Sequence, residues 1–162
     1  MRILTVLALS LLTVACGFQL RGEAQLPAFM ERTLIVSGDQ SSPFLRELER
    51  LLEANGVEVE TRPGESQAEL VIVSERLRRE PLTIAGDARV REFVLIFELT
   101  LSLSDPDGVL RIDRETLRLT RDYSFDEQEI LAATREEEFL RSDLRQAMAT
   151  RVLRRLEGLG ET

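Results

Sequence analysis

RVREFVLIFELTLSLS, residues 89–104, is the stretch of the chain that decides its fold. Large apolar residues stand at every second position, and a period of two is typical of a β-strand that turns one face toward a core. The residues on this face are Phe93, Leu95, Phe97, Leu99, Leu101 and Leu103. Because this face has to be covered, the rest of the chain is expected to supply elements that pack against it.

The next four residues, Asp105-Pro106-Asp107-Gly108, have the composition of a tight turn. Proline fixes φ and glycine permits positive φ, so the chain is expected to reverse its direction here. The run from Val109 to Phe125 is then predicted to pair with residues 89–104 as an antiparallel strand. Its buried positions are predicted to be Leu117, Leu119, Tyr123 and Phe125.

Two helices are predicted, one before and one after the main strands. Ser42 and Pro43 offer an N-cap and a first-turn proline, and Asn55-Gly56 supplies the C-terminal stop of the first helix. The second helix begins at Asp126-Glu127 and ends at Gly158, with arginines near its end that match the helix dipole. Its core-facing stripe comprises Leu140, Leu144, Met148, Val152 and Leu156.

Two further strands complete the predicted sheet. Thr33–Val36 is a short β-rich run, Glu69–Leu77 is a strand-like run, and Pro81–Ala88 is predicted to be a loop. The order β-α-β-β-β-α predicts an α+β fold, a small and mostly antiparallel four-stranded sheet with two helices packed on one face. Residues 31–157 are expected to form this single domain, after a tether at 16–30 and before a short tail at 158–162.

The first fifteen residues have the layout of a signal peptide. A basic start leads into an apolar run from Ile3 to Leu12, and small residues follow directly before Cys16. The apolar run is shorter than the roughly 20 residues that a membrane-spanning helix needs. We therefore expect residues 1–15 to direct export and to be removed.

A small residue followed by cysteine resembles the bacterial lipobox, in which the cysteine becomes a lipidated N-terminus. Cys16 is the only cysteine of the chain, so no intramolecular disulfide competes for its thiol. We predict covalent diacylglycerol and N-acyl lipid on Cys16, and the alternative is an ordinary secreted protein with an unpaired cysteine. Gly17, and not aspartate, follows the cysteine, which by resemblance to the sorting rule implies the outer membrane.

The composition argues against catalysis. The chain has no histidine, which excludes Ser-His-Asp triads, Cys-His dyads and histidine-ligated metals. Asp105 and Asp107 are the nearest candidates for a carboxylate pair or a calcium loop, but the neighbouring proline and glycine explain them as turn residues. We therefore expect no enzyme, no metal and no cofactor apart from the covalent lipid. The net charge of −8 argues against nucleic acid as a partner.

All 21 basic residues of the chain are arginines. A guanidinium group forms bidentate hydrogen bonds to phosphate or carboxylate, so a local group of arginines is a candidate anion site. One such group lies on the two predicted strands that flank the loop at 81–88, where a hairpin would bring its members together. The members are Arg76, Arg78, Arg79, Arg89 and Arg91. The alternative is a solvated face with ion pairs to Glu75, Glu80 and Glu92.

Three segments of the chain together resemble the LPS-assembly lipoprotein family (LptE). Residues 16–22, Cys-Gly-Phe-Gln-Leu-Arg-Gly, look like the family's Cys-Gly-aromatic-X-Leu-Arg start, and residues 89–93 are similar to the Glu-Tyr entry of its central strand. The third segment is the most specific. It runs from residues 121–126, Arg-Asp-Tyr-Ser-Phe-Asp, through Leu131-Ala132 and Glu138 to residues 153–156, Leu-Arg-Arg-Leu.

The resemblance implies an outer-membrane lipoprotein that plugs the lumen of the lipopolysaccharide translocon barrel LptD, assists its assembly and contacts lipopolysaccharide. Lipid A carries phosphates, for which the five arginines named above are the candidate ligands. Where the family often has basic residues, this chain has Gly86 and Ala133, with Arg89 and Arg135 close by. The alternative is a lipid-anchored periplasmic accessory or structural lipoprotein with no transport role, which the fold alone does not distinguish.

Overall fold

The computed structural model describes residues 25–60, 62–64, 67–84, 90–125, 128 and 130–160, and of residues 83, 84, 90 and 91 only the backbone. The predicted signal peptide, Cys16 and Arg89 lie outside the described residues. The strands are β1 (Arg32–Ser37), β2 (Glu58–Glu60), β3 (Ala68–Ile84), β4 (Val90–Ser104) and β5 (Leu110–Ser124). The helices are the short 3-10 helix η2 (Ala28–Met30), α2 (Pro43–Glu53) and α3 (Ile130–Glu157).

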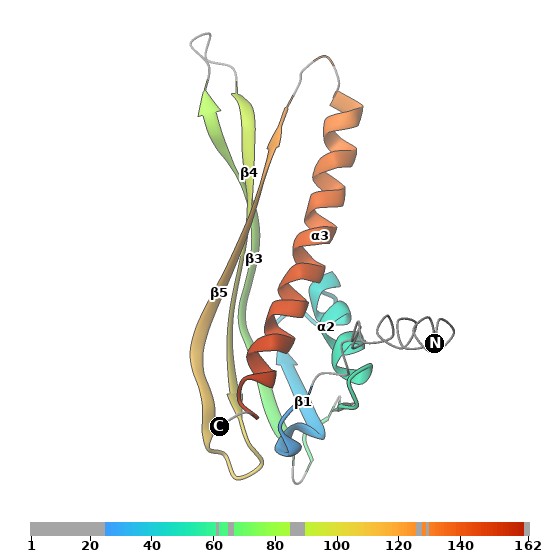
Figure 1. The fold of residues 1–162 in the computed structure, drawn as a ribbon, viewed down its shortest axis with the longest axis vertical. Helices are drawn as coiled ribbons and strands as arrows, with labels where there is room; N and C mark the ends of the chain where they lie inside the picture. The colour runs from blue at the N-terminus through green and yellow to red at the C-terminus, as the bar shows by residue number, and fades with distance from the viewer. Residues whose placement is uncertain are drawn as a thin grey trace, which may run out of the picture.

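The strands form one mixed sheet in the order β2-β1-β3-β4-β5, with α2 and α3 on the same side of it (Figure 1). β1 runs parallel to both β2 and β3, whereas β4 pairs antiparallel with β3 and with β5. The predicted α+β class, its β-α-β-β-β-α order and the placement of both helices on one face are confirmed.

The prediction of four strands misses β2. Gly56 has a φ of 84°, which lets the chain turn sharply at the end of α2, and Val57 is then buried at 5% exposure. The next three residues lie beside β1, so that Arg32 pairs with Glu58. A strand of three residues is too short to show a period of two, and therefore the sequence pattern carried no sign of it.

Ser42 caps α2 as the sequence predicted. Its Oγ accepts hydrogen bonds from the backbone N–H groups of Phe44 at 3.1 Å and Leu45 at 3.3 Å, and Pro43 occupies the first turn. The same hydroxyl donates to Glu75 of β3 at 2.7 Å. The cap therefore begins the helix and also fixes this first turn against the sheet.

The apolar face of β4 forms the core together with both helices, as predicted. Leu95, Phe97, Leu99, Leu101 and Leu103 are all at 0% exposure. From α2, Phe44 meets Phe97 edge to face, with the ring centroids 5.4 Å apart. The fully buried residues of the α3 stripe are Leu144, Met148, Val152 and Leu156.

A β-bulge changes the parity of β5. Leu101 pairs with Glu115 and Leu103 with Ile112, so β5 has one residue more than β4 between these two pairs. Arg114, inside the bulge, has a φ of 42°. Ile112 is therefore buried at 3% exposure, although it stands on the opposite parity to the buried Leu117. The predicted parity holds only on the C-terminal side of the bulge.

β3 continues to Ile84, so the loop predicted at Pro81–Ala88 begins later than expected. β1 covers only the first part of β3, from Ala68 to Ile72, and no described strand pairs with that edge of β3 beyond this point. Because proline has no N–H to donate, it is tolerated in a strand where one edge is unpaired. The prediction that the strand has ended before Pro81 is therefore wrong.

We expect Leu99→Ala to lower the free energy of unfolding by about 2–5 kcal/mol, because it leaves a cavity at the centre of the packed face. Denaturant unfolding followed by circular dichroism measures the loss. Val73→Ala is the matched control, since Val73 is 37% exposed on a neighbouring strand. Equal losses in the two variants would contradict the assignment of the buried face.

Candidate functional site

The structure places adjacent members of the candidate arginine group on opposite faces of the sheet. Arg78 pairs with Ile96 on the face that the helices leave open, and Arg79 pairs with Leu95 on the face that they cover. Successive side chains of a strand point to opposite sides, so these two arginines do not meet.

The other members of the group are distributed as follows. Arg76 pairs with Glu98 and shares the open face with Arg78, and its side chain forms no hydrogen bond or ion pair with another described residue. Arg91 lies on β4 with only its backbone described, and Arg89 lies outside the described residues. The described side chains thus contribute two arginines on one face and one on the other.

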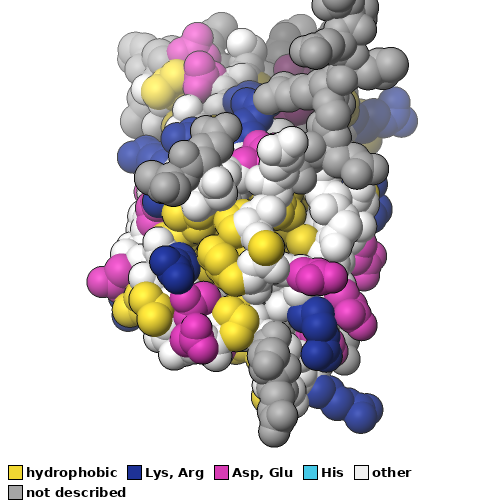
Figure 2. Space-filling view, turned by 60° about the horizontal axis from the view of Figure 1, so that its bottom comes forward, with side chains coloured by type: hydrophobic (Ala, Val, Ile, Leu, Met, Phe, Trp, Pro, Cys, Tyr) yellow, Lys and Arg dark blue, Asp and Glu magenta, His cyan; other side chains and the backbone are white. Residues whose placement is uncertain are grey.

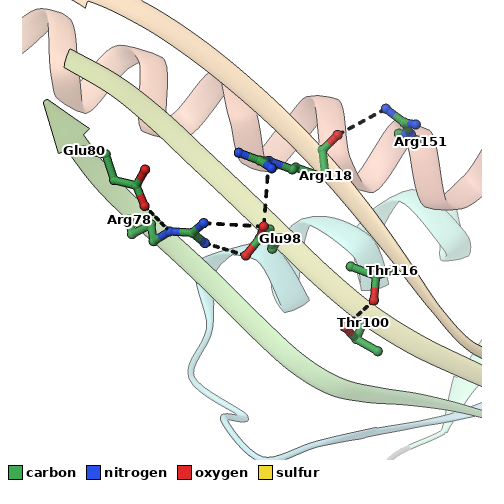
Figure 3. Close-up of polar contacts among 7 residues, drawn as sticks. All are labelled: Arg78, Glu80, Glu98, Thr100, Thr116, Arg118 and Arg151. Carbon is green, nitrogen blue, oxygen red and sulfur yellow. Dashed lines mark hydrogen bonds and ion pairs between the residues drawn. The ribbon is translucent and has the colours of Figure 1, made fainter. Parts of the chain in front are cut away.

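An ion-pair network lies on the open face, and we call it the Glu98 network (Figure 3). Its members are Arg78, Glu80, Glu98 and Arg118. Arg78 donates to both oxygens of Glu98 and, through Nε, to Glu80 at 2.7 Å. Arg118 Nε lies 3.7 Å from Glu98 Oε1. The network therefore ties all three long strands together across one face.

Hydrogen bonds from Arg78 hold the pKa of the Glu98 carboxyl below its usual value. The side chain of Arg78 is 40% exposed and that of Glu98 is 31% exposed, so water screens the pair and its contribution to stability is small. An anion that approached Arg78 would compete with two carboxylates. Arg78 is thus engaged in ion pairs with Glu80 and Glu98 on this face.

Five side chains meet between the sheet and α3, and we call them the Glu137 cluster. They are Arg79, Phe93, Tyr123, Glu137 and Arg141. Glu137 Oε2 accepts hydrogen bonds from Tyr123 OH at 2.5 Å and from Arg79 Nη1 at 2.9 Å. Glu137 Oε1 accepts one from Arg141 Nε at 2.8 Å. The guanidinium of Arg79 also lies over the ring of Phe93, 4.5 Å from its centroid.

The Glu137 carboxyl is only 18% exposed. Burial alone would raise its pKa, but hydrogen bonds from Tyr123, Arg141 and Arg79 outweigh this and hold the pKa below its usual value. The cluster therefore keeps one carboxylate charged beneath α3, with both of its oxygens engaged.

The sequence reading placed Tyr123 on the buried side of its strand but missed the role of Glu137. Glu137 stands within a run of three glutamates, at residues 136–138, and nothing in that run distinguishes the one that faces the sheet. Its spacing of seven residues from the buried Leu144 was the available sign, because positions seven apart share one face of a helix.

The two halves of α3 are attached to the sheet in different ways. Six of its seven buried residues, from Leu144 to Leu156, lie in the C-terminal half, and only Ala133 is buried in the N-terminal half. Large apolar residues are exposed where the N-terminal half of α3 and the end of β3 reach the upper end of Figure 1, which we call the distal end. They are Leu82, Ile130, Leu131 and Phe139.

The opposite end of the molecule also carries apolar surface. Figure 2 brings this end forward and shows hydrophobic side chains gathered in a patch, with acidic side chains and arginines beside it. Val109 and Leu110, at the start of β5, are 52% and 59% exposed. Exposed apolar side chains therefore lie at both ends of the molecule.

Asp105 has a structural role in the turn between β4 and β5. Its carboxylate accepts hydrogen bonds from the N–H groups of Asp107 at 3.0 Å and Val109 at 2.9 Å, and from Arg111 Nε at 2.9 Å. These contacts use the donors that a turn offers, and the described residues contain no group of metal-ligating side chains. No helix within the described ranges is long and apolar enough to cross a membrane.

Glu137→Gln is expected to lower the free energy of unfolding by about 1–2 kcal/mol at neutral pH, because amide hydrogen bonds replace charge-assisted ones. A carboxyl whose pKa is lower in the folded than in the unfolded state stabilises the fold at pH values above its unfolded pKa, near 4.5. It loses this contribution as the pH falls through its folded pKa. The difference between wild type and variant should therefore shrink below that pH. Unfolding at several pH values measures it, with Glu136→Gln as the exposed control. A difference that is independent of pH would contradict the assignment.

Comparisons with known proteins agree with this architecture. The profile of the LptE family, described as lipopolysaccharide-assembly, matches residues 31–156. A protein of Photorhabdus laumondii named LPS-assembly lipoprotein LptE is 28% identical over 96% of this chain and 85% of its own length. A Yersinia pestis protein of the same name is 28% identical, over 96% of this chain and 75% of its own.

Two solved structures share the fold. A lipoprotein B of Nitrosomonas europaea superposes with a TM-score of 0.76 at 28% identity, covering 90% of this chain and 94% of its own. The rare lipoprotein B of Shewanella oneidensis superposes with a TM-score of 0.69 at 23% identity, covering 78% and 94%. Because the family profile spans the sheet and both long helices, the chain belongs to the LptE lipopolysaccharide-assembly family.

Proposed function

We propose that this chain is an outer-membrane lipoprotein that partners and plugs the LptD barrel, assists its assembly and helps to insert lipopolysaccharide into the outer leaflet. The observation that carries the proposal is the family match over residues 31–156, which takes in the whole sheet and both long helices. The relatives named LPS-assembly lipoproteins support it, since each of the two described above matches over 96% of this chain.

The proposed anchor is lipid on Cys16, exposed as the new N-terminus by removal of residues 1–15. Residues 16–30 would then form the tether to the domain at 31–157, with a tail at 158–162. Met30, the last residue of this tether, is at 0% exposure within the core, and Thr33 Oγ1 donates to its carbonyl at 2.8 Å. The tether would thus be held firmly where it meets the domain.

We place the lipopolysaccharide contact at the distal end. β3 ends at Ile84 and β4 begins at Val90 at this end of the molecule, so Arg91 of β4 is near it and Arg89 precedes β4 directly in the sequence. Guanidinium groups there would meet lipid A phosphates, and the exposed Leu131 and Phe139 would meet acyl chains. Arg78 is a weaker candidate for the phosphate contact than Arg89 and Arg91, because it is already bound to two carboxylates.

Cys16→Ala should remove the anchor and leave the protein soluble or unprocessed. Fractionation of cells that express the variant tests the location, and mass spectrometry of the wild-type N-terminus tests the modification. Wild-type protein that carries an unmodified cysteine, or that is cleaved elsewhere, would refute the proposed anchor.

Arg89→Glu combined with Arg91→Glu should abolish lipopolysaccharide binding and leave folding and co-purification with LptD intact, because the exchange reverses local charge outside the core. Retention of lipopolysaccharide by the purified full chain is the measurement. Arg62→Glu with Arg154→Glu is the control, since it makes the same charge change at two exposed arginines elsewhere. Unchanged binding would exclude the pair as the site. Wild-type protein that does not co-purify with LptD would instead favour a lipoprotein without a transport role.

A further inference from the structure

The outer edge of β5 is a long sheet edge with which no described strand pairs. β5 is the last strand in the sheet order and runs for 15 residues, from Leu110 to Ser124. Edge strands present rows of N–H and C=O groups that another chain is able to bind, so soluble proteins protect them. A group of this edge that is already bound by a side chain of the same molecule is closed to such pairing.

Two arginine side chains bind carbonyl groups of this edge. Arg151 Nη1 of α3 donates to the carbonyl of Arg118 at 3.4 Å, and Arg121 Nη1 donates to that of Thr120 at 3.0 Å. The contact of Arg151 is drawn in Figure 3. Carbonyls two residues apart on a strand point to the same edge, so both bonds lie along one row.

α3 holds these guanidinium groups in place. Asp143 of α3 accepts a hydrogen bond from Arg121 Nε at 2.9 Å, which fixes the arginine beside the edge. About two and three turns further along α3, Arg151 reaches the edge directly and Arg155 binds Glu115 at 2.8 Å. The bulge at Arg114 interrupts the edge just before these contacts begin.

The sequence of this edge is complementary to itself. If two copies paired antiparallel about Thr120, Arg118 of each copy would stand opposite Asp122 of the other on the open face. Leu117 would stand opposite Tyr123 on the helix-covered face. A second copy of the chain is therefore a strand whose charges complement this edge.

We propose that Arg121 and Arg151 close the β5 edge against antiparallel pairing with a second copy of this chain. Each guanidinium has to leave its carbonyl before an N–H group of another strand is able to bind there. Two edges that approached one another would also bring the capping guanidinium groups of Arg121 and Arg151 of both copies together. The proposal goes beyond the proposed transport role and does not rest on it.

Arg121→Met together with Arg151→Met tests the proposal, because methionine keeps part of the apolar stem and removes the charge and the donors. The full chain in detergent is studied by sedimentation velocity at increasing protein concentration. We expect one chain per particle for the wild type and a concentration-dependent shift to two for the double variant. Arg145→Met with Arg154→Met is the control on the same helix, since neither side chain binds another described residue.

A third substitution tests the pairing itself. Asp122→Arg, added to the double variant, sets like charges opposite each other and should return the protein to one chain per particle. Adding Arg118→Asp as well should restore the dimer. A double variant that keeps its circular dichroism spectrum and stays monomeric would overturn the proposal. A double variant that still dimerises after Asp122→Arg is added would overturn it as well. If the double variant does not fold, Arg151→Met alone is judged by the same shift.

Discussion

Burial of one face of β4 against two helices is the constraint on which the rest of this structure depends. The side chains from Leu95 to Leu103 at alternate positions have no contact with water, and Phe44 of α2 closes over them at Phe97. β4 lies between β3 and β5, so each neighbour has to present its own apolar residues to the same side. The bulges near Val73 and Arg114 serve this purpose, because each removes one residue from the pairing and lets the sequence on either side keep its apolar groups inward.

Charged side chains lie around that core, at the positions that the apolar side chains do not occupy. On the open face, Arg78 and Arg118 bind Glu98 across three strands, in contact with solvent. On the covered face, toward the distal end, Arg79 and Tyr123 engage Glu137 beneath α3. α3 is thus attached to the sheet mainly by apolar side chains in its C-terminal half and by the Glu137 cluster in its N-terminal half.

Much of the fold was readable because its signals were local. The alternation in β4, the Ser42 cap and the Asp105 turn each depend on a few neighbouring residues, and each is found where the pattern predicted it. What failed depended on pairing between distant segments. β2 exists only because β1 offers it an edge, and the bulge in β5 appears only in its register with β4. The arginine group illustrates a different limit, since Arg78 and Arg79 are neighbours in sequence and strand geometry alone separates them.

The parallel pairing of β1 with β3 also bears on the order in which the strands are expected to pair during folding. β3, β4 and β5 follow one another in the chain and pair antiparallel, so their hydrogen bonds form between segments that are close in sequence. β1 reaches β3 only after the chain has crossed through α2 and β2, which requires a longer loop to close. We therefore expect β1 to pair with β3 only after β3, β4 and β5 have formed their three-stranded meander, although β1 precedes all three in the chain.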